Sequence, residues 1–77
     1  MIKDLITYMA KALVDNPDKV EVNEVLGEHT SVIELKVAKE DIGKIIGKQG
    51  RTAQSLRTII NAASTKEKRR CTLEIIE

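Results

Sequence analysis

The sequence predicts an α+β fold, a two-layer sandwich in which three helices lie on one face of a three-stranded mixed sheet. Apolar residues recur at helical spacing near the N-terminus and again in two segments in the middle of the chain. Three other segments are rich in β-branched residues with strand-like alternation. The resulting order is helix, strand, strand, helix, helix, strand, which favours a two-layer sandwich. Because there is no repeat or linker composition, residues 1–77 are predicted to form one domain.

The first predicted element is an amphipathic helix over residues 2–14. Its apolar residues are spaced three or four apart, with lysine, aspartate and threonine between them. Pro17, in the segment DNPD, ends this helix, because proline lacks an N–H group and disfavours the α conformation in the residue before it.

Two strands follow the first helix. Residues 20–26 (VEVNEVL) predict a strand with an irregularity near Asn23, and residues 31–37 (SVIELKV) alternate between apolar and polar side chains. Residues 27–29 join the two strands in a hairpin-like turn.

The second half of the chain contains the remaining elements. Residues 39–46 predict a helix of about two turns, and a second helix runs from Arg51 to about Ser64. The inward stripe of this second helix consists of Ala53, Leu56, Ile60 and Ala63. The polar segment TKEKRR then leads to a closing strand at residues 71–76. Its part KEKRR, residues 66–70, is interpreted either as a solvated connection or as a nucleic-acid contact.

Charge is distributed unevenly along the chain. Residues 1–35 hold three lysines against seven acidic residues, whereas residues 36–71 hold ten lysines and arginines against three acidic residues. A basic region of this kind favours a polyanionic partner.

Several classes of protein are disfavoured by composition. Cys71 and His29 are the only cysteine and the only histidine, so neither a metal site, a disulfide nor a nucleophile with its base is expected. With Tyr8 as the sole aromatic residue, the chain cannot present a platform on which bases stack. Charged residues interrupt the apolar N-terminal segment, which excludes a signal peptide or membrane span there. We therefore expect a cytoplasmic, non-catalytic protein without a cofactor.

The segment IIGKQGR, residues 45–51, lies between the two middle helices. Two glycines three residues apart allow a tight turn and a close approach of another backbone. The helix that begins after the turn directs free N–H groups and the positive end of its dipole towards any group above it, which favours an anion. Lys44, Lys48 and Arg51 add positive charge at the same place. A phosphodiester backbone would satisfy all of these features.

The longer segment DIGKIIGKQGRTAQSLRTII resembles the central part of a KH domain, whose signature is Ile/Val-Ile-Gly-x-x-Gly between two helices. The order of elements resembles the type II, bacterial arrangement, with an additional helix and strand at the N-terminus. Over its whole length the chain is similar to the small bacterial single-domain RNA-binding proteins of the KhpA family. The resemblance implies a cleft for about four unpaired nucleotides, with limited sequence specificity and a role in post-transcriptional control and cell-envelope growth.

The resemblance also implies which residues bind RNA. They are the loop, its neighbouring cations and the apolar residues before it: Gly47, Lys48, Gln49, Gly50, Arg51, Lys44, Ile45 and Ile46. Residues 33–37 would border or support the cleft. Ala53 departs from the pattern, because many KH domains carry a bulky aliphatic residue three positions after the second glycine, and this predicts a shallower groove floor.

A second hypothesis assigns the domain to protein interaction. In the last helix Ile59, with Ser55 and Ala62, lies beside the inward stripe and forms a candidate apolar contact for a homodimer. The resemblance points to the same partners, since the family is associated with self-pairing and with a larger KH-containing protein. The sequence leaves open whether RNA or single-stranded DNA is the preferred ligand, because that depends on a contact to the 2′-hydroxyl.

Overall fold

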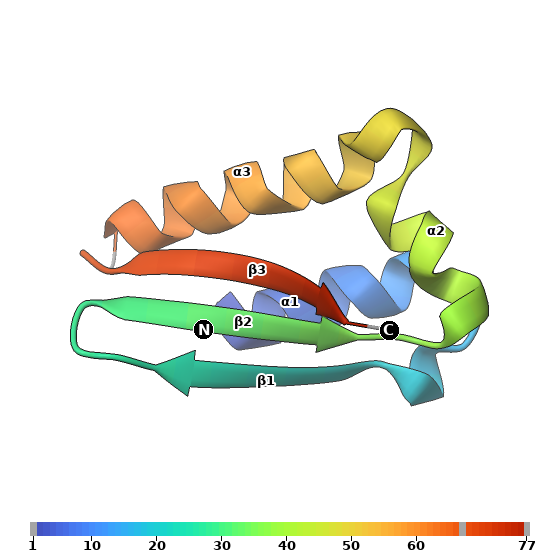
Figure 1. Ribbon diagram of the computed structural model, residues 1–77, viewed down its shortest axis with the longest axis horizontal. Coiled ribbons are helices and arrows are strands. Elements are labelled where there is room, and N and C mark those ends of the chain that lie inside the picture. Colours follow the sequence, from blue (N-terminus) through green and yellow to red (C-terminus); the bar gives the residue numbers. More distant parts are fainter. Residues whose placement is uncertain (1, 67, 77) are drawn as a thin grey trace.

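The computed structural model describes residues 2–66 and 68–76. Its helices lie against one face of a three-stranded mixed sheet, and its elements follow the predicted order (Figure 1). The predicted α+β sandwich is therefore confirmed. The elements are the helices α1 (Ile2–Leu13), α2 (Ile42–Ile46) and α3 (Arg51–Lys66), the strands β1 (Glu21–Leu26), β2 (Thr30–Lys36) and β3 (Arg70–Ile76), and the 3₁₀ turns η1 (Pro17–Lys19), η2 (Lys39–Asp41) and η3 (Lys48–Gly50).

β2 is the central strand of the sheet, since the strand order is β1-β2-β3. It pairs antiparallel with β1 through a tight turn and parallel with β3. A parallel pair requires a crossover connection, and α2 and α3 provide it. The last strand of the domain therefore lies beside the central strand, next to α3 (Figure 1).

The irregularity predicted near Asn23 is wrong. Pairing of β1 with β2 is uninterrupted, and Asn23 lies directly opposite Glu34. The alternation in the sequence breaks because β1 is an edge strand that buries little. Val22 is its one buried residue, while Val25 and Leu26 are 54% and 64% exposed.

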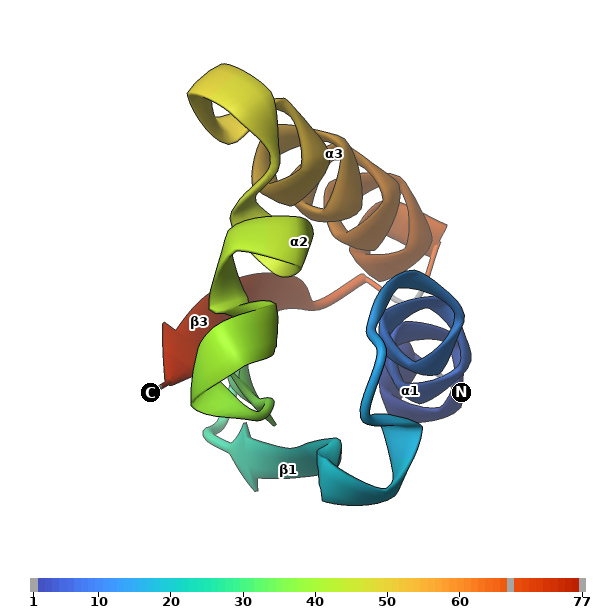
Figure 2. The same cartoon turned by 90° about the vertical axis from the view of Figure 1, so that its right-hand side faces the viewer.

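The core lies between the sheet and the helices. Ile33 and Leu35 of β2 are completely buried, and they are part of one apolar cluster with Ile6 of α1, Ile45 of α2 and Ile60 of α3. Complete burial of one such side chain contributes about 1.5–3 kcal/mol. The two long helices lie on the same side of the sheet (Figure 2), so this cluster holds both layers together.

The C-terminal end of α3 is closed by a Schellman motif. The N–H of Arg69 donates to the carbonyl of Ser64 at 3.0 Å, and the N–H of Lys68 donates to the carbonyl of Thr65 at 3.1 Å. Lys68 has φ 57°, in the left-handed region where glycine is the usual residue. The helix consequently extends to Lys66, beyond the predicted end.

The side chain of Arg69 connects this segment to the turn between β1 and β2. Its guanidinium donates to Ser31 Oγ at 3.3 Å and to the carbonyls of Gly27 and Glu28 at 3.1 and 3.4 Å. Ser31 is completely buried. Arg69 thus has a structural role, whereas Lys68 and Arg70 remain exposed on either side of it.

Candidate nucleic-acid interface

The Gly-Lys-Gln-Gly loop makes a single tight turn between α2 and α3. Gly47 has φ 77° and ψ 173°, Gln49 has φ 58°, and Gly50 has φ 74°. The N–H of Gly47 donates to the carbonyl of Gly43 at 2.9 Å, and the N–H of Gly50 donates to that of Gly47 at 3.1 Å. Three of four residues thus have positive φ, and the two glycines remove much of the steric cost.

The two glycines face different surroundings. A Cβ atom at Gly47 would overlap the Thr52 side chain, lying 2.6 Å from its Cβ and 2.8 Å from the Thr52 backbone nitrogen. A Cβ atom at Gly50 would meet no atom within 4 Å. The first glycine therefore allows α3 to pack against the loop, and the second leaves the outer side of the turn open to another molecule.

The outer side of the loop carries positive charge. Among the described residues, the side chains of Lys48 and Arg51 form no ion pair. These two side chains and that of Gln49 are exposed. Lys48 and Gln49 directly precede α3 and Arg51 begins it, so all three lie at the positive end of the helix dipole. This group can hold a phosphate through the N-terminal end of α3 and two exposed cations.

Lys44 differs from this pair of free cations. Its ammonium group lies 3.0 Å from the carboxylate of Asp15 and 4.0 Å from that of Asp41. The hydrogen bond and charge of Asp15 raise the pKa of Lys44 against a smaller opposing effect of burial. Lys44, which we expected at a phosphate, is therefore engaged by an acidic side chain in this structure.

Asp41 fixes the segment that contains Asp15. Its carboxylate is completely buried and accepts hydrogen bonds from the Asn16 backbone and side chain, both at 3.0 Å, and from the Asp15 backbone at 3.3 Å. Burial alone would raise the pKa of Asp41, but the hydrogen bonds from Asn16 and Asp15 and the charge of Lys44 outweigh it and lower the pKa. Asp41 therefore fastens the end of α1 to the beginning of α2. We call this set of contacts the Asp41 clasp.

The apolar residues before the loop have separate positions. Ile45 is completely buried in the core, whereas Ile46, directly before Gly47, is 40% exposed. Ala53 is 3% exposed and belongs to the buried face of α3. Ile46 is thus the residue of this group that can contact a base beside the loop, and Ile45 supports it from below.

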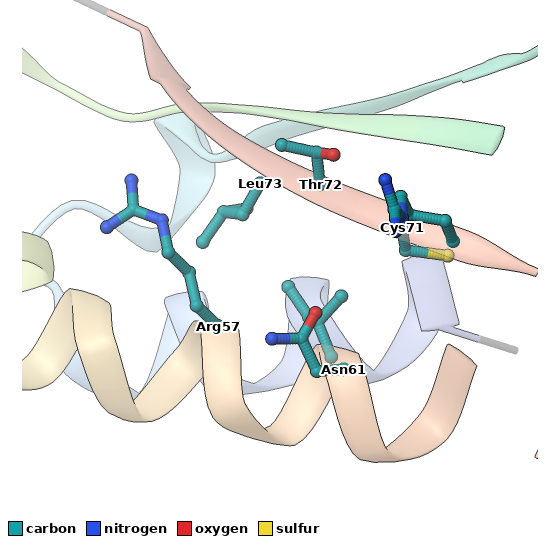
Figure 3. Close-up of a pocket in the computed structure, with 7 residues that line it drawn as sticks. Arg57, Asn61, Cys71, Thr72 and Leu73 are labelled. Atoms are coloured by element: carbon teal, nitrogen blue, oxygen red, sulfur yellow. The ribbon is translucent and has the colours of Figure 1, made fainter. Parts of the chain in front are cut away.

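A pocket of about 260 Å³ lies between α3 and β3 (Figure 3). α3 contributes Arg57, Ile60 and Asn61, and β3 contributes residues 70–73. The sequence analysis did not identify this pocket, because it expected residues 33–37 to border or support the cleft. Most of these residues lie in the central strand β2, where Ile33 and Leu35 are completely buried, so these two can support a cleft but cannot border it.

A groove of about 290 Å³ lies on the other flank of α3, against α1. Its lining is Tyr8, Met9, Ala12 and Leu13 of α1 with Thr52, Ser55 and Leu56 of α3. Of the predicted dimer residues, Ser55 lines this groove, Ile59 is 40% exposed one turn further along α3, and Ala62 is exposed. Tyr8, at 74% exposure, adds an aromatic surface that the sequence analysis had not assigned to this face.

Within residues 2–66 and 68–76, no group of acidic, histidine or cysteine side chains is arranged to hold a metal ion. In the same residues no helix is long and apolar enough to cross a membrane.

Comparison with known proteins gives consistent matches. Residues 3–75 match the family model described as "KhpA/KhpB, KH domain". The relative from Caldanaerobacter subterraneus subsp. tengcongensis, named RNA-binding protein KhpA, is 62% identical over 95% of this chain and 97% of its own length. Proteins of the same name from Clostridium perfringens and Aquifex aeolicus are 53% and 54% identical, over 97% and 99% of this chain and 100% and 96% of their own lengths. No solved structure matches the chain.

Proposed function

Because the chain belongs to the KhpA/KhpB family of KH domains, which are binding modules and not enzymes, we propose that it binds single-stranded RNA through the loop from Gly47 to Gly50. The observation that carries the proposal is the open outer side of this loop. A Cβ at Gly50 would meet nothing within 4 Å, and the exposed side chains of Lys48 and Arg51 beside it form no ion pair among the described residues. The name of the relatives, RNA-binding protein KhpA, supports the same ligand.

The RNA backbone passes over the loop in this proposal. A phosphate accepts hydrogen bonds from the backbone N–H groups of Lys48 and Gln49, and the side chains of Lys48 and Arg51 neutralise its charge. The exposed part of Ile46 provides an apolar contact for an adjoining base. The loop contacts the phosphate backbone, which is the same for every base, and the loop has no aromatic side chain that could stack on a base. The loop therefore accepts RNA of any sequence.

Binding by so few contacts is weak and depends on salt. For a single strand the slope of log affinity against log salt is about −0.7 for each phosphate neutralised, so the one phosphate held at the loop would give a slope of about −0.7. We place this activity in the cytoplasm and in post-transcriptional control.

A fluorescence-anisotropy titration of a short unstructured RNA pool at two salt concentrations tests the proposal. The variant Lys48→Asp/Gln49→Asp repels phosphate and retains both glycines. The control Lys19→Asp/Asn23→Asp makes the same change in net charge at exposed positions in η1 and β1. We expect the loop variant to lose at least about tenfold in affinity and the control to lose much less.

Circular dichroism must first establish that each variant is folded. Equal binding by the loop variant and the control would refute the proposal. The same RNA sequences made as DNA reveal whether a contact to the 2′-hydroxyl contributes, because such a contact would weaken binding to the DNA.

A second candidate function is self-association through α1 and α3. The groove between these helices is apolar, and the exposed parts of Tyr8, Leu13 and Ile59 border it or lie beside it. Two copies, or one copy and a larger KH-containing protein, could cover this surface. Pairing would join two weak RNA sites into a tighter one.

Analytical sedimentation, which measures the mass of the particle in solution, tests whether the chain self-associates through this surface. Ile59→Asp places a charge on the apolar surface, and Gln54→Asp places one on an exposed polar position of the same helix. We expect the natural chain and Gln54→Asp to sediment as dimers and Ile59→Asp as a monomer. An unchanged mass for Ile59→Asp would refute the dimer contact.

A further inference from the structure

The pocket between α3 and β3 combines an apolar floor with a polar rim. Ile60, Cys71 and Leu73 form the floor and are 1%, 4% and 3% exposed. The rim consists of the exposed residues Arg57, Asn61, Arg70 and Thr72. This combination suits a flat ring with hydrogen-bonding groups at its edge and is unfavourable for a phosphate, whose charge would face the apolar floor.

The size of the pocket limits what it can hold. At about 260 Å³ it lies below the roughly 300–1,000 Å³ of pockets that enclose drug-sized ligands. One nucleobase is a suitable occupant, whereas a larger ligand is not. Base stacking is not available there, because none of the seven lining residues is aromatic, so apolar contact and the polar rim must provide the affinity.

The α3 side of the rim presents unused hydrogen-bonding groups. Arg57 and Asn61 are four residues apart on α3, which makes their side chains neighbours. In the described part of the chain neither side chain forms a hydrogen bond or an ion pair. Figure 3 shows Arg57 extending from α3 towards β3, with the Asn61 amide close to α3 beside the stem of the Arg57 side chain.

The chemistry of these two side chains discriminates among the bases. The Arg57 guanidinium offers donors and no acceptor. Guanine presents two neighbouring acceptors, O6 and N7, which match a bidentate arginine, whereas adenine presents a donor at the position of O6. The oxygen of the Asn61 amide can accept a hydrogen bond from an N–H group of the same base.

We propose that this pocket holds one guanine base and that Arg57, assisted by Asn61, determines the specificity of the bound RNA. This inference rests on the proposed function, because the loop must hold the backbone of the same strand. Arg57 follows Arg51 by six residues on α3, a helical rise of about 9 Å. A strand held at the loop can therefore place a nearby base at Arg57. A single selected base leaves the remaining positions free, consistent with limited sequence specificity.

Anisotropy titrations with single-site RNAs test the proposal. A short oligouridine carries guanine, adenine, cytosine or uracil at one central position, and the proteins are the natural chain, Arg57→Ala, Arg57→Lys and Asn61→Ala. We expect the natural chain to prefer the guanine RNA by roughly tenfold. Arg57→Ala should remove this preference and retain the weaker binding to the other three RNAs. Arg57→Lys keeps the charge but should also lose the preference, because lysine lacks the planar fork.

Three outcomes would overturn the inference. They are no guanine preference in the natural chain, an equal loss of affinity for all four RNAs in Arg57→Ala, and a full preference in Arg57→Lys. The second of these would identify Arg57 as a phosphate contact.

The loop variant Lys48→Asp/Gln49→Asp separates this inference from the function on which it rests. If the loop variant binds all four RNAs as well as the natural chain does, the proposed function is wrong. If the loop variant loses binding but replacing Arg57 does not change the base preference, only the present inference is wrong.

Amide chemical shifts provide the location of the base. We expect guanine RNA, more than plain oligouridine, to shift the amide signals of Asn61 and Thr72. Shifts confined to residues 47–51 would contradict placement of the base in the pocket.

Discussion

Replacing each glycine around the loop by alanine tests the packing argument at Gly47. The backbone of Gly47 has φ 77° and ψ 173°, a conformation that is nearly restricted to glycine and costs another residue about 1–3 kcal/mol. The added Cβ would also lie 2.6 Å from the Thr52 Cβ, and relieving such an overlap costs about 1–3 kcal/mol more. Gly47→Ala should therefore lose about 3 kcal/mol or more of unfolding free energy.

Two other glycines serve as matched controls. Gly50 also has positive φ, but a Cβ there meets nothing within 4 Å, so Gly50→Ala should cost only about 1 kcal/mol. Gly43 lies within α2, its φ is not in the left-handed region, and a Cβ there also meets nothing within 4 Å. Gly43→Ala should consequently stabilise the protein by about 0.5–1 kcal/mol.

Thermal unfolding followed by circular dichroism measures all three variants. For a domain of this size 1 kcal/mol corresponds to a shift of roughly 4–8 °C in the melting temperature, so Gly47→Ala should melt roughly 12–24 °C below the natural chain. That loss is a large part of a total stability of roughly 4–11 kcal/mol. Adding Thr52→Ala removes only the hydroxyl and methyl groups and should recover part of the loss. Equal melting temperatures for Gly47→Ala and Gly50→Ala would refute the packing argument.

Three further predictions concern other parts of the fold. The pKa of Asp41 is lowered in the folded protein, so its stabilising effect is present above the ordinary pKa of 3.8 and is lost as pH falls through the lower folded value. The melting temperature of Asp41→Asn should therefore lie below that of the natural chain at pH 7, and the difference between the two should narrow below pH 3.8. A constant difference in melting temperature from pH 7 to pH 2 would contradict this. Lys68→Gly should raise the melting temperature by roughly 4–8 °C, because glycine tolerates φ 57°, while Lys66→Gly in the helix should lower it. Asp15→Asn removes the closer of the two carboxylates beside Lys44, so RNA affinity should rise and the salt slope should steepen by up to about 0.7. An unchanged slope would show that Lys44 contacts no phosphate.

The order and type of the elements were predictable because each is encoded by local periodicity. α1 and α3 carry apolar residues at helical spacing, and β2 alternates so regularly that its buried face could be assigned from Ile33 and Leu35. The turn conformation at Gly47 and Gly50 was also predictable, since few other residues adopt it. The steric requirement for glycine at position 47 was not predictable, because the sequence does not show how closely Thr52 approaches it.

Features formed between distant segments could not be predicted. The Asp41 clasp joins residues 25 and 26 positions apart, and no pattern in DNPD or KED indicates that they meet. The α3–β3 pocket depends on the parallel pairing of β3 with β2, which brings Cys71 and Leu73 against Ile60. Arg57 and Asn61 could have been noted as two polar residues on one flank of the inward stripe of α3, but only the position of β3 makes that flank a pocket.

The parallel pairing of β2 with β3 has a consequence for biosynthesis. The ribosome makes the loop and α3 before it makes β3, yet Cys71 and Leu73 of β3 complete the core beneath α3. At about 5–20 residues per second, the ten residues after Lys66, up to Ile76, take about 0.5–2 s to make, and during this time part of the apolar surface of α3 is uncovered. Parallel pairing across a crossover is also intrinsically slow, because it closes a long segment of chain before native contacts form. The core therefore cannot be completed until β3 has been made, and a chain that ends before Arg70 carries the Gly47–Gly50 loop on a sheet that lacks its third strand.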